Sequence, residues 1–128
     1  MIPKFRAYSA EENIMYYPDE DKNVEWTIDD DTGFIAPLIN LENGMWGMID
    51  KYVLMQSTGL KDLNGVEIFE GDILFDKHHN PQIGVVVFYE GAFQLLANNM
   101  YYPLIQFDGD VEIIGNIHEN PELLEGTE

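Results

Sequence analysis

The fold is decided by the stretch VLMQSTGLKDLNGVEIFEGDIL, residues Val53–Leu74. Between two apolar runs it carries the pair Asn64-Gly65, which is typical of a hairpin turn because both residues tolerate positive φ. The pair Gly71-Asp72 then leads into the next apolar run. We expect Gly59 and Gly71 to lie at positions of positive φ or of close backbone approach, and Asp72 to accept hydrogen bonds from turn amides. The stretch therefore predicts a meander of short strands.

The sequence after this stretch continues the same pattern. The apolar, β-branched run Gln82–Tyr89 is the strongest strand signal, and the pairs Glu90-Gly91 and Asn98-Asn99 predict tight turns. Further strands are expected at Ala92–Leu96, Tyr101–Phe107 and Val111–Ile117, and a short helical turn after Asn120-Pro121. Five short strands with tight turns between Phe69 and Ile117 are typical of a small SH3-like barrel.

The N-terminal part reads as β-hairpins. Lys4–Tyr8 and Ile14–Tyr17 are expected to pair, and Val24–Ile28 alternates apolar and polar residues. Phe34–Ala36 is a candidate return strand that Pro37 interrupts, and residues 38–46 are expected to form a loop. The fold class predicted is mainly β (a β-rich α+β protein). It has an N-terminal β-hairpin subdomain, residues 1–51, and an SH3-like barrel with a short C-terminal helical turn, residues 52–128.

The net charge of the chain limits the classes of molecule that it can bind. Six basic and 24 acidic residues give the 128-residue chain a net charge of −18. Such a charge repels phosphate backbones and anionic membranes, so we expect no direct nucleic-acid or membrane binding. The absence of cysteine, of a secretory signal and of a long apolar stretch predicts a cytosolic protein. The acids are either a solvated surface or a feature that binds a basic partner.

The acidic run Asp29, Asp30 and Asp31, followed by Thr32-Gly33, resembles the start of a calcium loop. An EF-hand loop closes on a glutamate at its twelfth position, and the twelfth residue from Asp29 is Asn40. A surface turn explains this run better, although its acids remain candidates for contact with a partner.

The histidines do not form a metal motif. His78 and His79 are adjacent, so on an extended chain their side chains point in opposite directions, and Asp76 and His118 do not complete a known ligand spacing.

A second group of acids is Asp108, Asp110 and Glu112, which share one strand face if the segment is extended. A solvated face is the simpler interpretation, and a cation site that uses one of the histidines is the alternative. With no cysteine and no phosphate loop, we predict no enzyme activity, no cofactor, no catalytic residues and no metal.

The segment around Met45, Trp46 and Met48 is apolar and lies in a region of weak secondary-structure signal. It either packs on the barrel or forms a contact with another chain, because Met and Trp are enriched at interfaces.

Three pieces of the chain resemble the YopX family, in order and over nearly its whole length: Lys4–Tyr8 with Met15–Tyr17, Leu54–Ile73, and Val111–Leu124. The resemblance implies a small protein encoded in phage genomes and bacterial prophages. The family carries no catalytic or binding residues that can be assigned to positions here, and the region from Asp19 to Met48 matches it least.

The expected function is that of a non-enzymatic phage or prophage accessory protein that acts through protein–protein contacts or self-assembly. Its partner is expected to be itself, as a homo-oligomer, or a basic host protein. One alternative is an acidic mimic of nucleic acid that inhibits a basic host defence or regulatory protein. A more distant alternative is a hydrolase that depends on a divalent metal.

Overall fold

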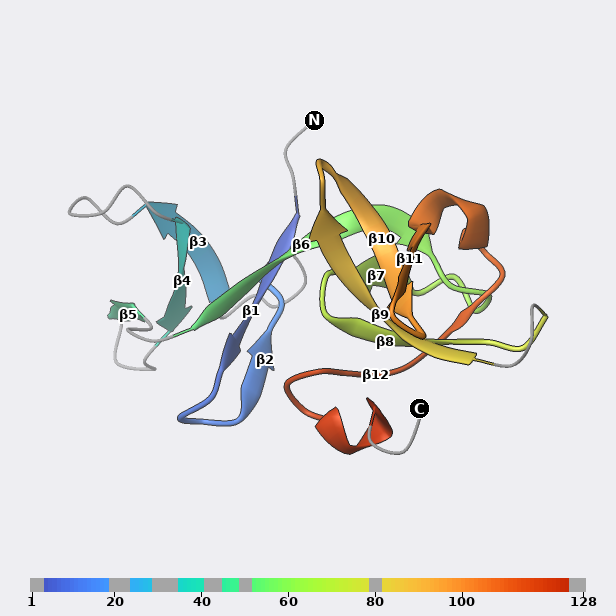
Figure 1. Ribbon diagram of the computed structural model, residues 1–128. Helices are drawn as coiled ribbons and strands as arrows, with labels where there is room; N and C mark the ends of the chain where they lie inside the picture. The colour runs from blue at the N-terminus through green and yellow to red at the C-terminus, as the bar shows by residue number, and fades with distance from the viewer. Residues whose placement is uncertain are drawn as a thin grey trace. The chain divides into compact units, whose positions relative to one another are not determined.

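The computed structural model describes residues 4–18, 24–28, 35–40, 45–48, 52–78 and 82–124 (Figure 1). Strands dominate these residues, and the helical segments among them are two short 3₁₀ turns. The chain divides into two compact units, Met1–Met55 and Gln56–Glu128. Among the described residues no helix is long and apolar enough to cross a membrane. The prediction of a mainly β protein is confirmed.

The first unit begins with the expected hairpin. Strand β1 (Phe5–Ser9) pairs antiparallel with β2 (Ile14–Tyr16). At the turn the Ser9 hydroxyl accepts a hydrogen bond from the Glu12 amide at 3.3 Å, and Asn13 has φ +56°. Asn is one of the few residues that adopt this conformation at small cost, which explains why the chain reverses here.

The same unit holds a sheet in the order β3-β4-β5, formed by Val24–Ile28, Ile35–Asn40 and Trp46–Met48. Two predictions were wrong here, because β4 continues through Pro37 and part of the expected loop is strand. Strand β5 pairs with β4 only from Leu38 onward. Before Leu38, one edge of β4 has no partner strand among the described residues, so Pro37 is tolerated there.

Strand β6 (Val53–Lys61) passes from the first unit into the second and pairs with β7 (Glu67–Phe69). The expected break at Thr58-Gly59 is a bulge inside one continuous strand, because Ser57 pairs with Phe69 while Lys61 pairs with Glu67. The Thr58 hydroxyl donates to the carbonyl of Ile68 at 2.8 Å, which ties the bulge to the partner strand.

The predicted Asn64-Gly65 turn is present. The Gly65 amide donates to the carbonyl of Asp62, and the Asp62 amide to that of Val66. Gly65 has φ +82°, whereas Asn64 is not among the residues with positive φ. This is a three-residue hairpin loop in which Gly65 alone needs the left-handed conformation.

The five strands expected between Phe69 and Ile117 form one antiparallel sheet in the order β11-β10-β9-β8-β12. Their bounds are Asp72–Asp76 (β8), Gln82–Tyr89 (β9), Ala92–Ala97 (β10), Met100–Pro103 (β11) and Glu112–Asn116 (β12). Glu90 and Gly91, at φ +52° and +81°, join β9 to β10, and Asn98 and Asn99, at +52° and +62°, join β10 to β11. Both predicted turns are therefore two-residue loops of the type that matches strand twist.

One strand prediction was half wrong. The expected strand Tyr101–Phe107 ends at Pro103 and continues as the 3₁₀ turn η1 (Leu104–Phe107). Leu104 and Phe107 are buried by this turn, whereas a continued strand points only alternate residues inward. The second 3₁₀ turn, η2 (Pro121–Leu124), begins at the expected proline.

The core of the second unit is a single apolar cluster. It collects buried side chains from β7, β8, β9, β10, η1 and the residue before β12, namely Ile68, Leu74, Val86, Leu95, Leu104, Phe107 and Val111. Side chains from so many strands meet only if the sheet curls around them, which is the arrangement of a small barrel. Gly84 belongs to this packing, since a Cβ there would lie 2.8 Å from Leu95 Cδ1.

Candidate interaction surface

Asp62 and Asp72, two of the three buried aspartates described in the second unit, accept hydrogen bonds from backbone amides. Asp62 is 4% exposed and accepts hydrogen bonds from the amides of Asn64 and Val66, both at 2.9 Å, and of Ile113 at 3.2 Å. Asp72 is 2% exposed and accepts from the amide of Phe69 at 2.8 Å. The predicted role of Asp72 and the positive φ of Gly59 and Gly71 are confirmed.

The segment after β12 is organised by another buried polar residue, Asn116. Its side-chain oxygen accepts from the amides of His118 and Glu119, and its side-chain nitrogen donates to the Glu119 carboxylate at 2.8 Å. The Asn120 side-chain oxygen in turn accepts from the Asn116 amide at 3.2 Å, so this oxygen holds the preceding turn. Gly115 is required beside it, because a Cβ there would lie 2.7 Å from that oxygen.

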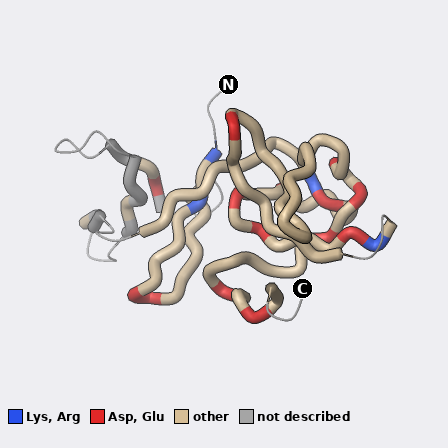
Figure 2. Tube along the Cα trace, in the orientation of Figure 1, with Lys and Arg blue, Asp and Glu red and all other residues tan. Residues whose placement is uncertain are grey.

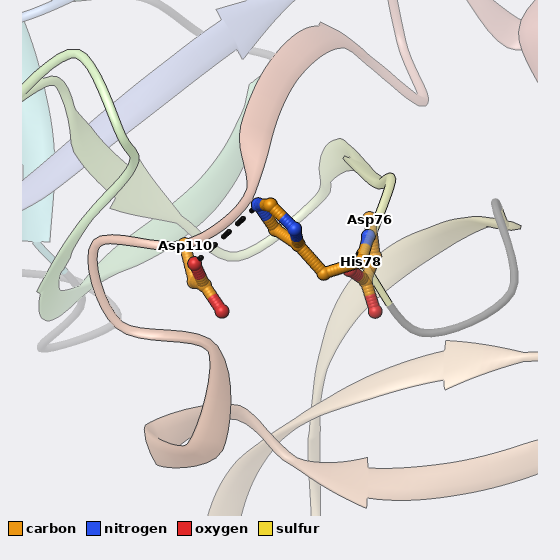
Figure 3. A network of polar contacts seen from close by, with 3 residues as sticks. All are labelled: Asp76, His78 and Asp110. Atoms are coloured by element: carbon orange, nitrogen blue, oxygen red, sulfur yellow. Dashed lines mark hydrogen bonds and ion pairs between the residues drawn. The ribbon is translucent and has the colours of Figure 1, made fainter.

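His78, considered above with Asp76 as a metal ligand, contacts two aspartates. The His78 amide donates to Asp76 Oδ1 at 3.0 Å, and the His78 ring nitrogen Nε2 lies 3.8 Å from Asp110 Oδ1 (Figure 3). The His78 and Asp110 side chains are 53% and 49% exposed. The contact is an ion pair only when His78 is protonated, and a pair this exposed then contributes about 1 kcal/mol at most.

The three acids expected on one strand face do not share it. Asp108 and Asp110 lie in the turn after η1, where Asp108 Oδ1 accepts from the Lys61 amide at 3.1 Å, and β12 begins only at Glu112. Among the described residues no group of three His, Asp or Glu side chains is placed to hold a metal ion. His79 lies outside the described residues.

The residues predicted to contact a partner lie in the first unit. Met45 is 61% exposed, and Trp46 and Met48 begin and end β5. Asp29, Asp30 and Asp31 lie outside the described residues. That these residues bind another chain stays a prediction.

Sequence reasoning missed a surface on the second unit. The register pairs Leu95 of β10 with Val86 of β9 and Tyr102 of β11, all three directed toward the core. Successive residues of a strand point to opposite faces, so their neighbours lie on the other side of the sheet. We call this side the outer face; it presents Val87, Tyr89, Gln94, Leu96, Tyr101 and Pro103.

The outer face is apolar and accessible. Tyr89 and Tyr101 are 42% and 43% exposed, and their rings stack with centroids 4.1 Å apart and planes at 9°. Val87, Gln94 and Leu96 are half-buried. The Gln94 side chain donates to the carbonyl of Tyr89 at 2.9 Å, which fixes the one amide on this face.

The surface is also almost free of charge. Between Gln82 and Phe107 the sole charged residue is Glu90, in a chain that carries 24 acids. In Figure 2 the tube of β9, β10 and β11 is tan except at the β9–β10 turn, whereas acids colour several other turns. The sequence signal for this surface is the run Gln82–Tyr89, which is apolar at both strand faces although an antiparallel sheet needs only one buried face.

Comparison with known proteins places this arrangement in a family. The YopX protein family model matches residues 4–125. Among solved structures, protein EF1440 from Enterococcus faecalis is similar at 36% sequence identity, with 98% of this chain and 99% of that chain covered and a TM-score of 0.65. Protein yopX from Bacillus subtilis is similar in fold, at 21% identity, 95% and 98% coverage and a TM-score of 0.69. No functionally curated protein matches the chain. The protein belongs to the YopX family.

Proposed function

We propose that this YopX-family protein acts by binding another protein chain rather than by catalysing a reaction. The observation that carries the proposal is the uncharged aromatic outer face of β9, β10 and β11, which exposes Tyr89 and Tyr101 as a stacked pair. Exposed apolar patches of this kind mark contact sites, and tyrosine is enriched at interfaces.

The polar residues of the second unit support the same proposal. Asp62, Asp72 and Asn116 lie in the YopX-like segments, and each accepts hydrogen bonds from backbone amides. A carboxylate committed to several amides in this way is a structural acceptor, because moving it leaves buried donors unsatisfied. We further propose that the protein is a phage or prophage accessory factor of the host cytosol, which its family and its lack of cysteine support.

The mimic of nucleic acid is the second candidate, and the net charge of −18 favours it. The two candidates differ in the surface used and in their response to salt. A mimic binds a basic protein through its acids, so salt weakens the complex, whereas an apolar contact persists when charges are screened.

The test is capture on the immobilised chain at low and at high salt. The wild type is compared with Gln94→Glu. This variant places a negatively charged side chain of nearly the same shape as glutamine at the centre of the outer face. Gln106→Glu, the same change at an exposed position of η1, is the matched control. We expect the wild type and Gln106→Glu to retain a protein, a second copy included, at both salts, and Gln94→Glu to retain none. A basic protein that salt releases and that Gln94→Glu still retains would instead establish the mimic.

A further inference from the structure

From the outer face of β9, β10 and β11 we infer its occupant: a second copy of this chain, with the two outer faces packed against each other across a two-fold axis. The inference rests on the proposed contact function and names the partner for that surface. Three features of the second unit lead to it, and they concern charge, shape and the sheet edge.

The charge distribution selects the surface and the partner. Two copies bring net charges of −18 together, so they can approach only where acids are sparse. The segment from Gln82 to Phe107 holds one acid, Glu90, and no Lys or Arg, so it offers a basic partner a single counter-charge and an acidic partner none. An uncharged face is electrostatically complementary to itself, which is the condition for a contact between identical surfaces.

The side chains on the face fit the same arrangement. The stacked rings of Tyr89 and Tyr101 form a flat aromatic slab at interplanar angle 9°. Around it lie Val87, Leu96 and Pro103, and Gln94 is already bonded to a backbone carbonyl. Two such slabs bury apolar area, and aromatic pairs contribute beyond the area that they bury.

The edge of the sheet does not offer a competing mode. Of the two edge strands, β11 is the one that belongs to the outer face, but it has four residues and ends at Pro103, which has no amide hydrogen to donate. A short edge that ends in proline extends poorly into a partner's sheet. The two copies therefore meet through their faces.

The experiment is sedimentation of the full chain at several concentrations in about 50 mM and about 500 mM NaCl, which changes the Debye length from roughly 14 Å to roughly 4 Å. We expect a dimer whose dissociation constant falls at least about threefold at the higher salt, because screening removes repulsion between like charges. Gln94→Glu raises the dissociation constant by about tenfold or more, since the contact buries an unpaired charge, while Gln106→Glu behaves as the wild type does. Tyr101→Glu provides a second disruption of the face if Gln94→Glu alters the fold.

Three results would overturn the inference. One is a chain that stays monomeric at every concentration and salt. Another is a dimer that Gln94→Glu and Tyr101→Glu leave intact, and the third is a dimer that salt weakens. A monomeric chain that retains a foreign protein, and that no longer does so after Gln94→Glu, would overturn the dimer alone, because the proposed contact function survives that result.

Discussion

At the scale of single residues, the buried aspartates Asp62 and Asp72 could be mistaken for catalytic or metal-binding groups, but they accept hydrogen bonds from backbone amides and so stabilise the fold. Asp62 illustrates this most clearly, because it joins its own turn to Ile113, far along the sequence. Nothing in the local sequence distinguishes this aspartate from its exposed neighbours. Its role depends on a strand partner that only the tertiary structure supplies, whereas the role of Asp72 follows from the turn beside it.

Replacing Asp62 tests this assignment. Asp62→Ala leaves the amides of Asn64, Val66 and Ile113 without their acceptor, and we expect it to lower the free energy of unfolding by about 3 kcal/mol. The exposed Asp108 accepts one amide, and Asp108→Ala should cost under about 1 kcal/mol. Urea denaturation measures both changes. Equal losses would show that Asp62 does not hold the turn and β12 together.

The hydroxyl of Tyr16 gives a prediction on pH. Burial, together with the hydrogen bond to and the negative charge of Glu12, raises the pKa of Tyr16 from 10.0 to about 12. The folded state therefore binds this proton more tightly than the unfolded state does. Its contribution to stability is complete below pH 10 and is lost as the pH rises toward 12.

The measurement is the free energy of unfolding of the wild type and of Tyr16→Phe at pH 8 and between pH 10 and 12. The wild type should lose more stability over this alkaline range than the variant does. A difference between the two proteins that stays constant with pH would contradict the raised pKa.

At the scale of elements, the turns were the most predictable part. Glu90-Gly91 and Asn98-Asn99 both form two-residue loops, because turn residues act locally. The wrong predictions lie where the structure of a segment depends on a neighbouring strand or on the core. Pro37 stays within β4 because β5 begins pairing only beyond it, and the strand expected at Tyr101–Phe107 becomes η1 because both Leu104 and Phe107 enter the core.

A reciprocal exchange tests the turns. Glu90 and Asn98 occupy the first loop position of the two turns with the same φ of +52°. Asparagine tolerates this conformation better than glutamate does, so Glu90→Asn should stabilise the protein and Asn98→Glu should destabilise it, each by about 0.5–1 kcal/mol. Thermal unfolding of dilute protein gives both signs. A change of the same sign in the two variants would rule out backbone conformation as the cause.

The outer face shows why a surface is harder to predict than a turn. The run Gln82–Tyr89 predicts a strand, but its residues alone do not say which of them face the core. That division needs the register with β10, which sets Val86 opposite Leu95 and leaves Val87 and Tyr89 outside. The sequence signal for the outer face is that this run is apolar at successive positions and not at alternate ones. That pattern predicts a strand but does not by itself predict an exposed apolar surface.

At the scale of the whole molecule, the charge of −18 acts on every part of the chain at once. Self-repulsion of this size opposes the compact state, and salt screens it. We therefore expect the melting temperature to rise by several degrees between about 20 mM and about 500 mM NaCl. The measurement uses Gln94→Glu at low concentration, so that self-association does not contribute. A melting temperature that falls with salt would mean that attractive ion pairs outweigh the repulsion.

The proposed function requires that the outer face of β9, β10 and β11 is the surface at which this protein binds. A dilution series of the ¹⁵N-labelled chain, followed by backbone amide shifts, tests this directly and residue by residue. We predict that the amides of Val87, Tyr89, Leu96 and Tyr101 shift with concentration while those of Val66 and Phe69, held by buried carboxylates, stay fixed. Shifts confined to the β5 segment around Trp46, or no shifts on the outer face at any concentration, would contradict it.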